Sequence, residues 1–444
     1  MLLKFAVSNF KSIGNEITFS MFPTQDNNDD RFLREIKTKR GNWKILRRGI
    51  FFGPNASGKT TIIDALNFVC KFVSYAKDFG IGTGVTQFKF GDTKFNDVTS
   101  FKILFYIQED VFEYGFSLNA DYVHEEWLSI LGNQKFVVLY TRQTDSEGKT
   151  TIDIQDELAE KGSEERALIE LLKGTITYEQ RNQLFLYKLA NNGVESMSNI
   201  VKWFRHVQFV YPFSKVKALP VAIKTNEDFT EYVENTLKKL DTGIFKVTTE
   251  TRGIRFDEFL KNKRLPQDMI EEVQKIRSGI VEVDGKCFIF SKGEEADTRL
   301  VEIKFEHHLY GKKVKFDLNE ESDGTKRLLD LLPMLFFGSK DDCRIYCVDE
   351  IDRSLHTKLS RYIISECVNA MQSKNLQIIF TAHDINLINL KYLRQDEIWF
   401  IEKNKNGEST IRPLSDFNIK DDTNLVNDYL AGRFGAVPTI GGKY

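Results

Sequence analysis

The sequence feature that most constrains the fold is the segment GPNASGKT at residues 53–60, which matches the pattern GxxxxGK(S/T). The apolar run IFF comes directly before it, and TIIDALNFVCKFVSYAK follows with apolar residues at helical spacing. Strand, glycine-rich loop and helix thus stand in the order that a phosphate-binding loop requires. We predict that Lys59 reaches the phosphates and that the hydroxyl of Thr60 binds Mg²⁺. The predicted nucleotide-binding residues of this segment are Gly53, Asn55, Gly58, Lys59, Thr60 and Thr61.

Two further apolar runs end in side chains that suit phosphate chemistry. RIYCVDE at 344–350 places Asp349 and Glu350 at the end of one predicted strand, and LQIIFTAHD at 376–384 places His383 at the end of the next. One helix separates these strands in sequence, so we expect them to be neighbours in a parallel sheet. Asp349 can then reach the Mg²⁺ on Thr60, Glu350 can deprotonate the attacking water, and His383 can sense the γ-phosphate. The alternatives are a solvated acidic strand end and a structural histidine.

A fourth polar motif lies in NEESDGTKRLLDLL at 319–332, directly before a predicted helix. Ser322 and Gly324 fit two interpretations, a helix N-cap and a phosphate-binding helix N-terminus. The loop at 53–60 already holds one phosphate chain, so this motif would act on a second nucleotide.

The pattern along the chain indicates an α/β fold assembled from both ends of the sequence. Residues 2–10 and 17–22 predict a hairpin, 98–142 an antiparallel sheet, 154–240 mainly helices, and 244–308 a few short strands. We expect residues 1–142 to form the N-terminal half of a P-loop NTPase head with an antiparallel β subdomain. Residues 143–300 would be a mainly helical lid insertion, and 301–444 the C-terminal half. No sustained heptads occur between 60 and 320, so we expect no long coiled coil.

Charge gives little support for general nucleic-acid binding. The chain has 62 Lys and Arg against 64 Asp and Glu, a net charge of −2, so it has no globally basic composition. A local patch remains an option in KTKRGNWKILRRG at 37–49, which holds six basic residues. The alternative is a basic strand that leads into the phosphate loop.

Other compositional signals favour a cytoplasmic protein. No apolar run is long enough to span a membrane, and the first residues lack the pattern of a signal peptide. The five cysteines contain no CxxC pair, so we expect reduced thiols and neither disulfides nor structural zinc. His307 and His308 are adjacent and would point to opposite faces of a strand, so we expect no metal beyond Mg²⁺.

Taken in order, the motifs NF-K-S at 9–12, GPNASGKT, ESDGT-KRLL, CVDEID and TAHD resemble those of ABC-type ATPase heads of the SMC/RecF superfamily. Within it the chain is most similar to the bacterial AAA-type, ABC-like ATPases of phage defence, the RloA and AbiL abortive-infection type. The ending NDYLAGRFGAVPTIGG at 427–442 is similar as well. The resemblance implies ATP and Mg²⁺ as ligands, ATP hydrolysis, and a head-to-tail dimer with two ATP molecules between the heads.

The same resemblance implies residue roles. Asp349 would bind the metal, Glu350 would be the general base, and His383 would be the switch histidine. The sequence SDGT departs from the SGGQ of transporters, and Asp323 adds a negative charge. For the Q-loop glutamine, Gln183 is preferred to Gln87. The residues implied to act across the dimer interface are Ser322, Gly324 and Asp352.

Three functional hypotheses follow. The first is a sensor or regulator of an anti-phage system that controls a separate effector such as a nuclease, because only about 45 residues follow the last predicted strand, too few for a nuclease domain. The second is a RecF-like ATPase that binds DNA. The third is a slow nucleotide switch whose ATP-bound dimer is a scaffold. We expect partner specificity to lie in the insertion at 143–300.

Overall fold

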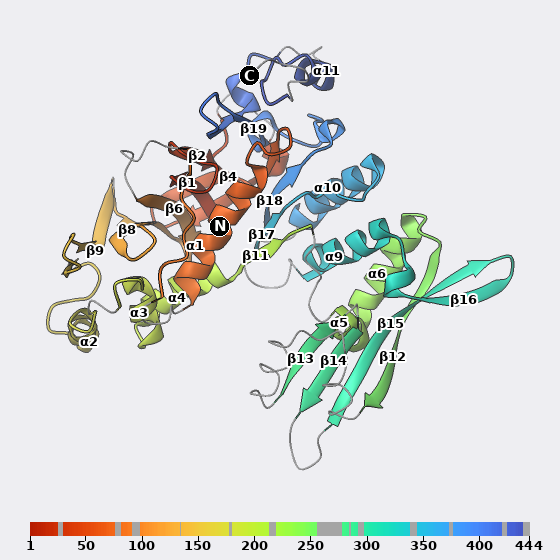
Figure 1. Ribbon diagram of the computed structural model, residues 1–444, viewed down its shortest axis with the longest axis horizontal. Helices are drawn as coiled ribbons and strands as arrows, with labels where there is room; N and C mark the ends of the chain where they lie inside the picture. Colours follow the sequence, from red (N-terminus) through yellow and green to blue (C-terminus); the bar gives the residue numbers. More distant parts are fainter. Residues whose placement is uncertain are drawn as a thin grey trace. The chain divides into compact units, whose positions relative to one another are not determined.

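The structure is a computed structural model in which the chain divides into two compact units (Figure 1). The first unit comprises Met1–Pro212, Ser339–Asp352 and Ser360–Tyr444, and the second comprises Phe213–Gly338 and Arg353–Leu359. The first unit is therefore built from both ends of the chain, while the boundaries predicted at 142 and 300 stay a prediction. The structure describes residues 1–24, 30–75, 81–90, 98–133, 135–176, 180–212, 219–254, 278–283, 286–291, 297–337, 344–372, 376–419 and 424–437.

A mostly parallel sheet forms the centre of the first unit. Its strand order is β11-β17-β18-β5-β19-β20, and only β20 runs antiparallel to its neighbour. All residues of β5 and β18 are buried, which explains why these strands read as continuous apolar runs. The prediction that the strands before Asp349 and His383 are parallel neighbours is confirmed. The strands are β5 (Arg48–Phe52), β11 (Val207–Val210), β17 (Arg344–Val348), β18 (Leu376–Ala382), β19 (Ile398–Lys403) and β20 (Ser409–Pro413).

A seven-stranded antiparallel sheet is the second layer of this unit, in the order β10-β9-β8-β7-β6-β1-β2. It confirms both the predicted N-terminal hairpin and the antiparallel sheet expected over 98–142. A separate hairpin joins β3 (Leu33–Thr38) to β4 (Gly41–Leu46). The seven strands are β1 (Leu2–Ser8), β2 (Ile17–Ser20), β6 (Thr99–Ile107), β7 (Asp110–Leu118), β8 (Val123–Leu131), β9 (Phe136–Thr144) and β10 (Thr150–Ile154).

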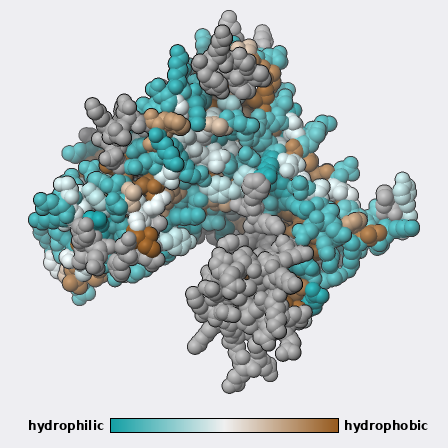
Figure 2. Space-filling view, in the orientation of Figure 1, coloured by the Kyte–Doolittle hydropathy of each residue, from teal (hydrophilic) through white to brown (hydrophobic). Residues whose placement is uncertain are grey.

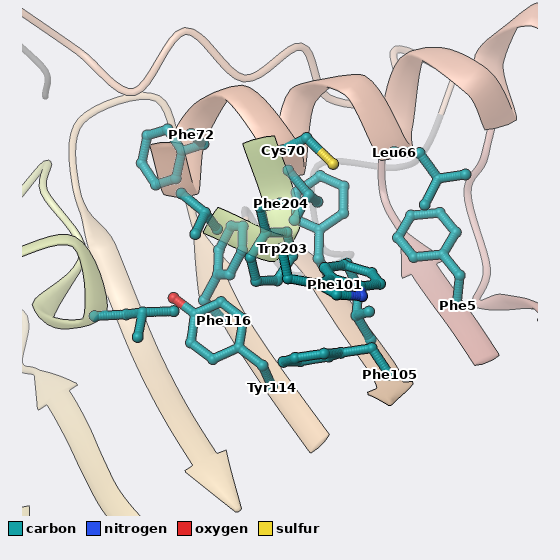
Figure 3. Packing of buried hydrophobic residues seen from close by; sticks show 14 of the residues in the cluster. Phe5, Leu66, Cys70, Phe72, Phe101, Phe105, Tyr114, Phe116, Trp203 and Phe204 are labelled. Carbon is teal, nitrogen blue, oxygen red and sulfur yellow. The ribbon is translucent and has the colours of Figure 1, made fainter. Parts of the chain in front are cut away.

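Two helices pack on the inner face of the antiparallel sheet through aromatic residues (Figure 3). In α1 (Lys59–Ser74), Phe72 stacks on Phe116 of β7 with ring centroids 5.6 Å apart. In α4 (Glu195–Arg205), Trp203 lies 4.6 Å from the ring of Phe105 in β6. Burial of such large rings dominates the stability of a core. It fixes α1, the helix that follows the phosphate loop, against the sheet.

The same core reaches the parallel sheet. Phe19 of β2 lies 4.9 Å from Phe51 of β5 and 5.2 Å from Trp399 of β19, between ring centroids. The described cysteines, Cys70, Cys287, Cys347 and Cys367, are all buried. Burial and the nearby Cys347 raise the pKa of the Cys70 thiol, which makes it unreactive.

The helical stretch predicted over 154–240 is only partly helical. Its described helices in the first unit are α2 (Glu164–Lys173), α3 (Phe185–Asn191) and α4. Within this stretch, α4 ends at Arg205 and Val207 begins β11, a strand that the sequence analysis did not foresee. β11 pairs in parallel with β17, so a long-range partner decides its conformation.

The second unit is an antiparallel sheet with helices. The sheet order is β12-β15-β14-β13, and β16 pairs with β15. Phe229 of α6 packs on Phe336 and Phe337 of α9, with ring centroids 5.2 and 4.8 Å away. Its elements are α5 (Leu219–Thr225), α6 (Glu227–Lys239), β12 (Ile244–Ile254), β13 (Ser278–Val283), β14 (Lys286–Ser291), β15 (Asp297–Leu309), β16 (Lys312–Asp317) and α9 (Asp323–Phe337).

These layers confirm the predicted class, a P-loop α/β head with an antiparallel β subdomain. The longest helices described, α1 and α10 (Thr357–Gln372), have 16 residues, and no long coiled coil occurs in the described part of the chain. Most of the coloured residues on the face seen in Figure 2 are hydrophilic, and the apolar ones stand in small separate groups. Among the described helices, which also include α11 (Leu425–Leu430), none is long and apolar enough to cross a membrane.

Candidate nucleotide-binding site

Two positions in the loop between β5 and α1, Gly53 and Gly58, tolerate only glycine. Gly58 has φ +111°, and a Cβ there would lie 2.2 Å from Oγ of Ser409 and 2.9 Å from Oγ of Ser12. A Cβ on Gly53 would lie 2.2 Å from the carbonyl oxygen of Ile401. Gly58 caps α1 without a side-chain acceptor, so the first N–H groups of the helix are available to bind an anion.

Lys59 is held at this loop. Its Nζ donates to the carbonyl oxygens of Gly53, at 2.7 Å, and Pro54, at 3.0 Å. Burial lowers the pKa of Lys59 to about 8, although the nearby carboxylates, Asp349 foremost, act in the opposite direction. An added phosphate would favour the charged form of this amine.

Thr60 and Asp349 meet across the carboxyl ends of β5 and β17. The Thr60 hydroxyl lies 3.0 and 3.2 Å from the two carboxylate oxygens of Asp349. Burial raises the pKa of Asp349, while hydrogen bonds from Thr381 and Thr60 act in the opposite direction. A hydroxyl and a carboxylate are hard oxygen ligands of the kind that Mg²⁺ takes together with nucleotide phosphates. Within the described residues no three His, Cys, Asp or Glu side chains form a metal site by themselves.

Glu350 and His383 lie beside this pair. Nε2 of His383 is 3.2 Å from Oε1 of Glu350, and both side chains are about one-third exposed, at 38% and 31%. Glu350 has φ +48°, a left-handed conformation that is costly for a residue with a Cβ. A partly exposed carboxylate in such a fixed conformation suits a group that must contact a water molecule.

Asp352 fixes the turn that carries His383. Its Oδ2 accepts hydrogen bonds from the backbone N–H groups of His383, at 2.9 Å, and Asp384, at 2.5 Å. This contact within one chain orients the histidine. The role across a dimer interface that the resemblance implies stays a prediction.

Three residues of the site, Thr381, Ser12 and Ser409, were not predicted from the sequence. Thr381 contacts both Asp349 and Glu350. Ser12 donates to Oγ1 of Thr61 at 3.0 Å, and Oγ of Ser409 lies 2.8 Å from Oγ of Ser12. Thr381 and Ser12 belong to the motifs TAHD and NF-K-S, which the sequence analysis identified without giving these two residues a role. Ser409 has no signal, because only folding brings it to the phosphate loop.

A chain of polar contacts ties α1 to the end of β11. Asp64, one turn after Thr60, accepts from Nζ of Lys11 at 2.6 Å and from the Tyr211 hydroxyl at 2.8 Å. Asn67 donates to the same hydroxyl at 2.9 Å. Burial raises the pKa of Tyr211, so it stays a neutral donor.

The two predicted Q-loop residues lie elsewhere in the first unit. Gln183 precedes α3, and its backbone carbonyl accepts a hydrogen bond from the guanidinium of Arg142. Gln87 lines an open groove of about 1390 Å³. The choice between Gln183 and Gln87 stays a prediction.

Ser322 and Gly324 belong to the second unit. Oγ of Ser322 accepts from the backbone N–H of Thr325 at 3.1 Å, which is the N-cap interpretation of this motif. A Cβ on Gly324 would lie 2.9 Å from the carbonyl oxygen of Ser354. Glu321, the residue before the motif, lies 2.7 Å from Nε2 of His307 and anchors the loop to β15. Action of the motif on a second nucleotide stays a prediction.

The other motifs have structural partners. Of the six basic residues at 37–49, Arg48 forms a buried ion pair with Glu397 at 2.8 Å, and Lys39 and Lys44 pair with Asp110 and Asp30. This favours the interpretation of a basic strand that leads into the phosphate loop. His307 and His308 bind different carboxylates, Glu321 and Glu306, so they share no ligand.

Residues 50–389 match the family described as "AAA domain, putative AbiEii toxin, Type IV TA system". The chain belongs to this family. The matched range of this AAA-domain family runs from β5 to beyond His383, so it contains the phosphate loop, Asp349 and Glu350. The matched range therefore contains most of the site, whereas Ser12 and Ser409 lie outside it. No curated protein matches the chain.

Solved SMC head structures are similar to the chain at low identity. The SMC head domain from Thermotoga maritima is 14% identical, over 94% of this chain and 99% of that one, with a TM-score of 0.38. An SMC head bound to the C-winged helix domain of ScpA is 16% identical, over 93% and 97%, with a TM-score of 0.41. An Smc head with an extended coiled coil, bound to the C-terminal domain of ScpA derived from Pyrococcus furiosus, is 15% identical, over 94% and 97%, with a TM-score of 0.39. Function is therefore argued from the site itself.

Proposed function

We propose that the protein binds ATP with Mg²⁺ and hydrolyses it to ADP and phosphate. The observation that carries this proposal is the hydrogen bond of 3.0 Å between Thr60 and Asp349, which unites the phosphate loop with an acidic strand end 289 residues away. Glu350 and His383, 3.2 Å apart, stand at the same edge of the sheet. A loop for phosphates, ligands for Mg²⁺ and a candidate base are the parts that phosphoryl transfer to water needs.

Each part has a chemical task in this reaction. Lys59 and the first N–H groups of α1 bind the phosphate oxygens, and Mg²⁺ held by Thr60 and Asp349 would neutralise charge on them when bound. Glu350 orients a water molecule and takes its proton as the oxygen attacks the γ-phosphorus, and the bond to the leaving oxygen of ADP breaks. His383 holds the Glu350 carboxylate and can donate to a phosphate oxygen.

We infer a head-to-tail dimer in which Ser322, Gly324 and Asp352 contact the nucleotide or the facing head. We infer a cytoplasmic sensor of the RloA and AbiL type that controls a separate effector such as a nuclease. The family description, which names a putative AbiEii toxin and a Type IV TA system, supports a role in such a system. The RecF-like alternative has less support, since three basic residues of the 37–49 segment are already in ion pairs.

Phosphate release by the purified protein with ATP and Mg²⁺ tests the proposed reaction. We expect Lys59→Ala to weaken ATP binding at least about 100-fold, because it removes a buried charge from the phosphates. Lys71→Ala, an exposed position on the same helix, is the matched control. Equal binding and hydrolysis by Lys59→Ala and the wild type would reject the proposed site.

Three further measurements address partners. Light scattering with ATP and with ADP reports whether dimerisation depends on the nucleotide. DNA affinity at about 50 and 200 mM salt separates the RecF-like alternative, because phosphate contacts lose affinity steeply over this range. Weak binding that neither salt nor ATP changes would exclude DNA loading. Toxicity of a nuclease-like protein encoded beside this chain, tested with the Lys59→Ala variant, reports on effector control.

A further inference from the structure

We propose that Thr381 is a positioning residue that holds the candidate metal ligand and the candidate general base in one geometry. The inference rests on the proposed ATPase function and names a residue that it had not assigned. Thr381 lies near the end of β18, the strand between β5 and β17, and is fully buried. Among the described residues, the Thr381 hydroxyl bonds to Asp349 and Glu350, so its effect would pass through these two neighbours.

The hydroxyl of Thr381 makes two hydrogen bonds in opposite senses. Oγ1 donates to Oδ1 of Asp349 at 2.7 Å. The same atom accepts from the backbone N–H of Glu350 at 2.8 Å. One hydroxyl has a single proton and two acceptor positions, so it can satisfy both contacts at once. Thr381 therefore links two consecutive residues that have different tasks.

The first contact orients the metal ligand. Asp349 receives hydrogen bonds from Thr381 on one side and from Thr60 on the other, and its carboxylate is almost entirely buried. Partners of this kind fix the direction of a ligating carboxylate, and their loss typically costs about 10- to 100-fold in metal affinity or activity. Removal of the Thr381 hydroxyl takes away one of these two hydrogen bonds.

The second contact holds a strained backbone. Glu350 has φ +48°, and such conformations persist only where neighbouring groups hold them. The carbonyl oxygen of Thr381 also accepts a hydrogen bond from the N–H of Ile351 at 3.0 Å. Thr381 thus binds the backbone N–H groups of Glu350 and of the residue after it. Without the hydroxyl, the backbone N–H of Glu350 loses this acceptor, which weakens the hold on the backbone that directs the Glu350 carboxylate.

Substitutions at this position can separate the hydroxyl from the volume of the side chain. Thr381→Val replaces only the hydroxyl with a methyl group of similar size, while Thr381→Ser keeps the hydroxyl. Thr298→Val is a matched control, since Thr298 of β15 is also buried and its hydroxyl has no hydrogen-bond partner in the described part of the chain. Thr381→Ala is the second test variant, and it removes both the hydroxyl and the Cγ2 methyl group of the threonine.

The experiment measures ATP binding in EDTA, ATP binding in Mg²⁺, and the Mg²⁺ dependence of hydrolysis. We expect Thr381→Val to bind ATP in EDTA like the wild type, because Lys59 and the loop are intact. We expect its half-saturating Mg²⁺ concentration to rise about 10-fold or more and its kcat to fall about 10- to 100-fold. Thr381→Ser is expected to stay within about threefold of the wild type in both quantities, and Thr298→Val to change neither.

Distinct results separate this inference from the proposed function. If the wild type shows neither Mg²⁺-dependent ATP binding nor hydrolysis, the proposed function fails and the inference falls with it. If the wild type is active and Thr381→Val keeps its Mg²⁺ dependence and kcat, only the inference is overturned. A lower melting temperature with unchanged Mg²⁺ dependence likewise overturns it, since the hydroxyl would then be structural. If Thr381→Val does not fold, the same criteria apply to Thr381→Ala.

Discussion

The hydroxyl of Thr60 lies 3.0 Å from a carboxylate oxygen of Asp349, although 289 residues separate them in the chain. Thr60 is the second residue of α1, the helix after β5, and Asp349 follows β17, with β18 between these strands in the sheet. The carboxyl ends of parallel strands meet at one edge, which is where ligands bind in such sheets. The contact defines where the phosphates and Mg²⁺ of the proposed substrate would lie.

Glu350→Gln should separate binding from hydrolysis. The amide cannot take a proton from water, so we expect hydrolysis to fall by about 10² to 10⁴-fold. ATP affinity should stay near that of the wild type, because the phosphate loop is unchanged. Single-turnover hydrolysis and equilibrium binding measure the two quantities. Hydrolysis at the wild-type rate would show that Glu350 is not the base.

The pH dependence of ATP affinity should report the charge of Lys59. Its pKa is about 8 in the free protein, and bound phosphates favour the charged amine, so the pKa must rise on binding. Affinity should thus be nearly constant well below pH 8 and fall above it, to about one-tenth of the pH 7 value at pH 9. Calorimetry at three pH values checks this and should detect proton uptake near pH 8. Lys59→Arg, which stays charged, should lose the dependence, whereas constant wild-type affinity from pH 7 to 9 would contradict the assignment.

Gly58→Ala should damage both the loop and the fold. The φ of +111° is unfavourable for alanine, and the added Cβ would lie 2.2 Å from Oγ of Ser409. We expect the free energy of unfolding to fall by about 3 kcal/mol, with a loss of ATP affinity. Gly193→Ala is the control, since Gly193 has φ +92° but nothing within 4 Å of the added Cβ. Its cost should be about 1 kcal/mol, without effect on ATP, and urea denaturation measures both.

Ser322→Arg should prevent assembly without preventing ATP binding. If Ser322 contacts the nucleotide of a facing head, a long cationic side chain at this position blocks the dimer. We expect the double variant Ser322→Arg with Glu350→Gln to stay monomeric in ATP, while Glu350→Gln alone accumulates dimers, as light scattering would show. Lys313→Ala combined with Glu350→Gln is the control, because Lys313 of β16 lies outside the motif and its side chain is 68% exposed. A dimer of unchanged stability in the double variant would exclude Ser322 from the interface.

Parts of the fold could be predicted because their signals are local. The spacing of GPNASGKT predicts the loop and α1, and the apolar runs before Asp349 and His383 predict β17 and β18 as parallel neighbours. In contrast, β11 was missed, since its four residues follow a helix and become a strand only by pairing with β17. Short segments take their conformation from long-range partners, which periodicity does not record.

The sequence by itself determined which chemical groups the protein carries and at which element ends they stand. Phosphate loop, acidic strand end and histidine all follow from local spacing, since a turn or a strand end depends on neighbouring residues. Only the tertiary structure decided that β18 lies between β5 and β17, and hence that Thr381 joins Asp349 to Glu350. It also brought Ser409 within 2.8 Å of Ser12, across 397 residues. The physical reason is that sheet order and side-chain contact depend on how distant segments pack, and no local pattern encodes that choice.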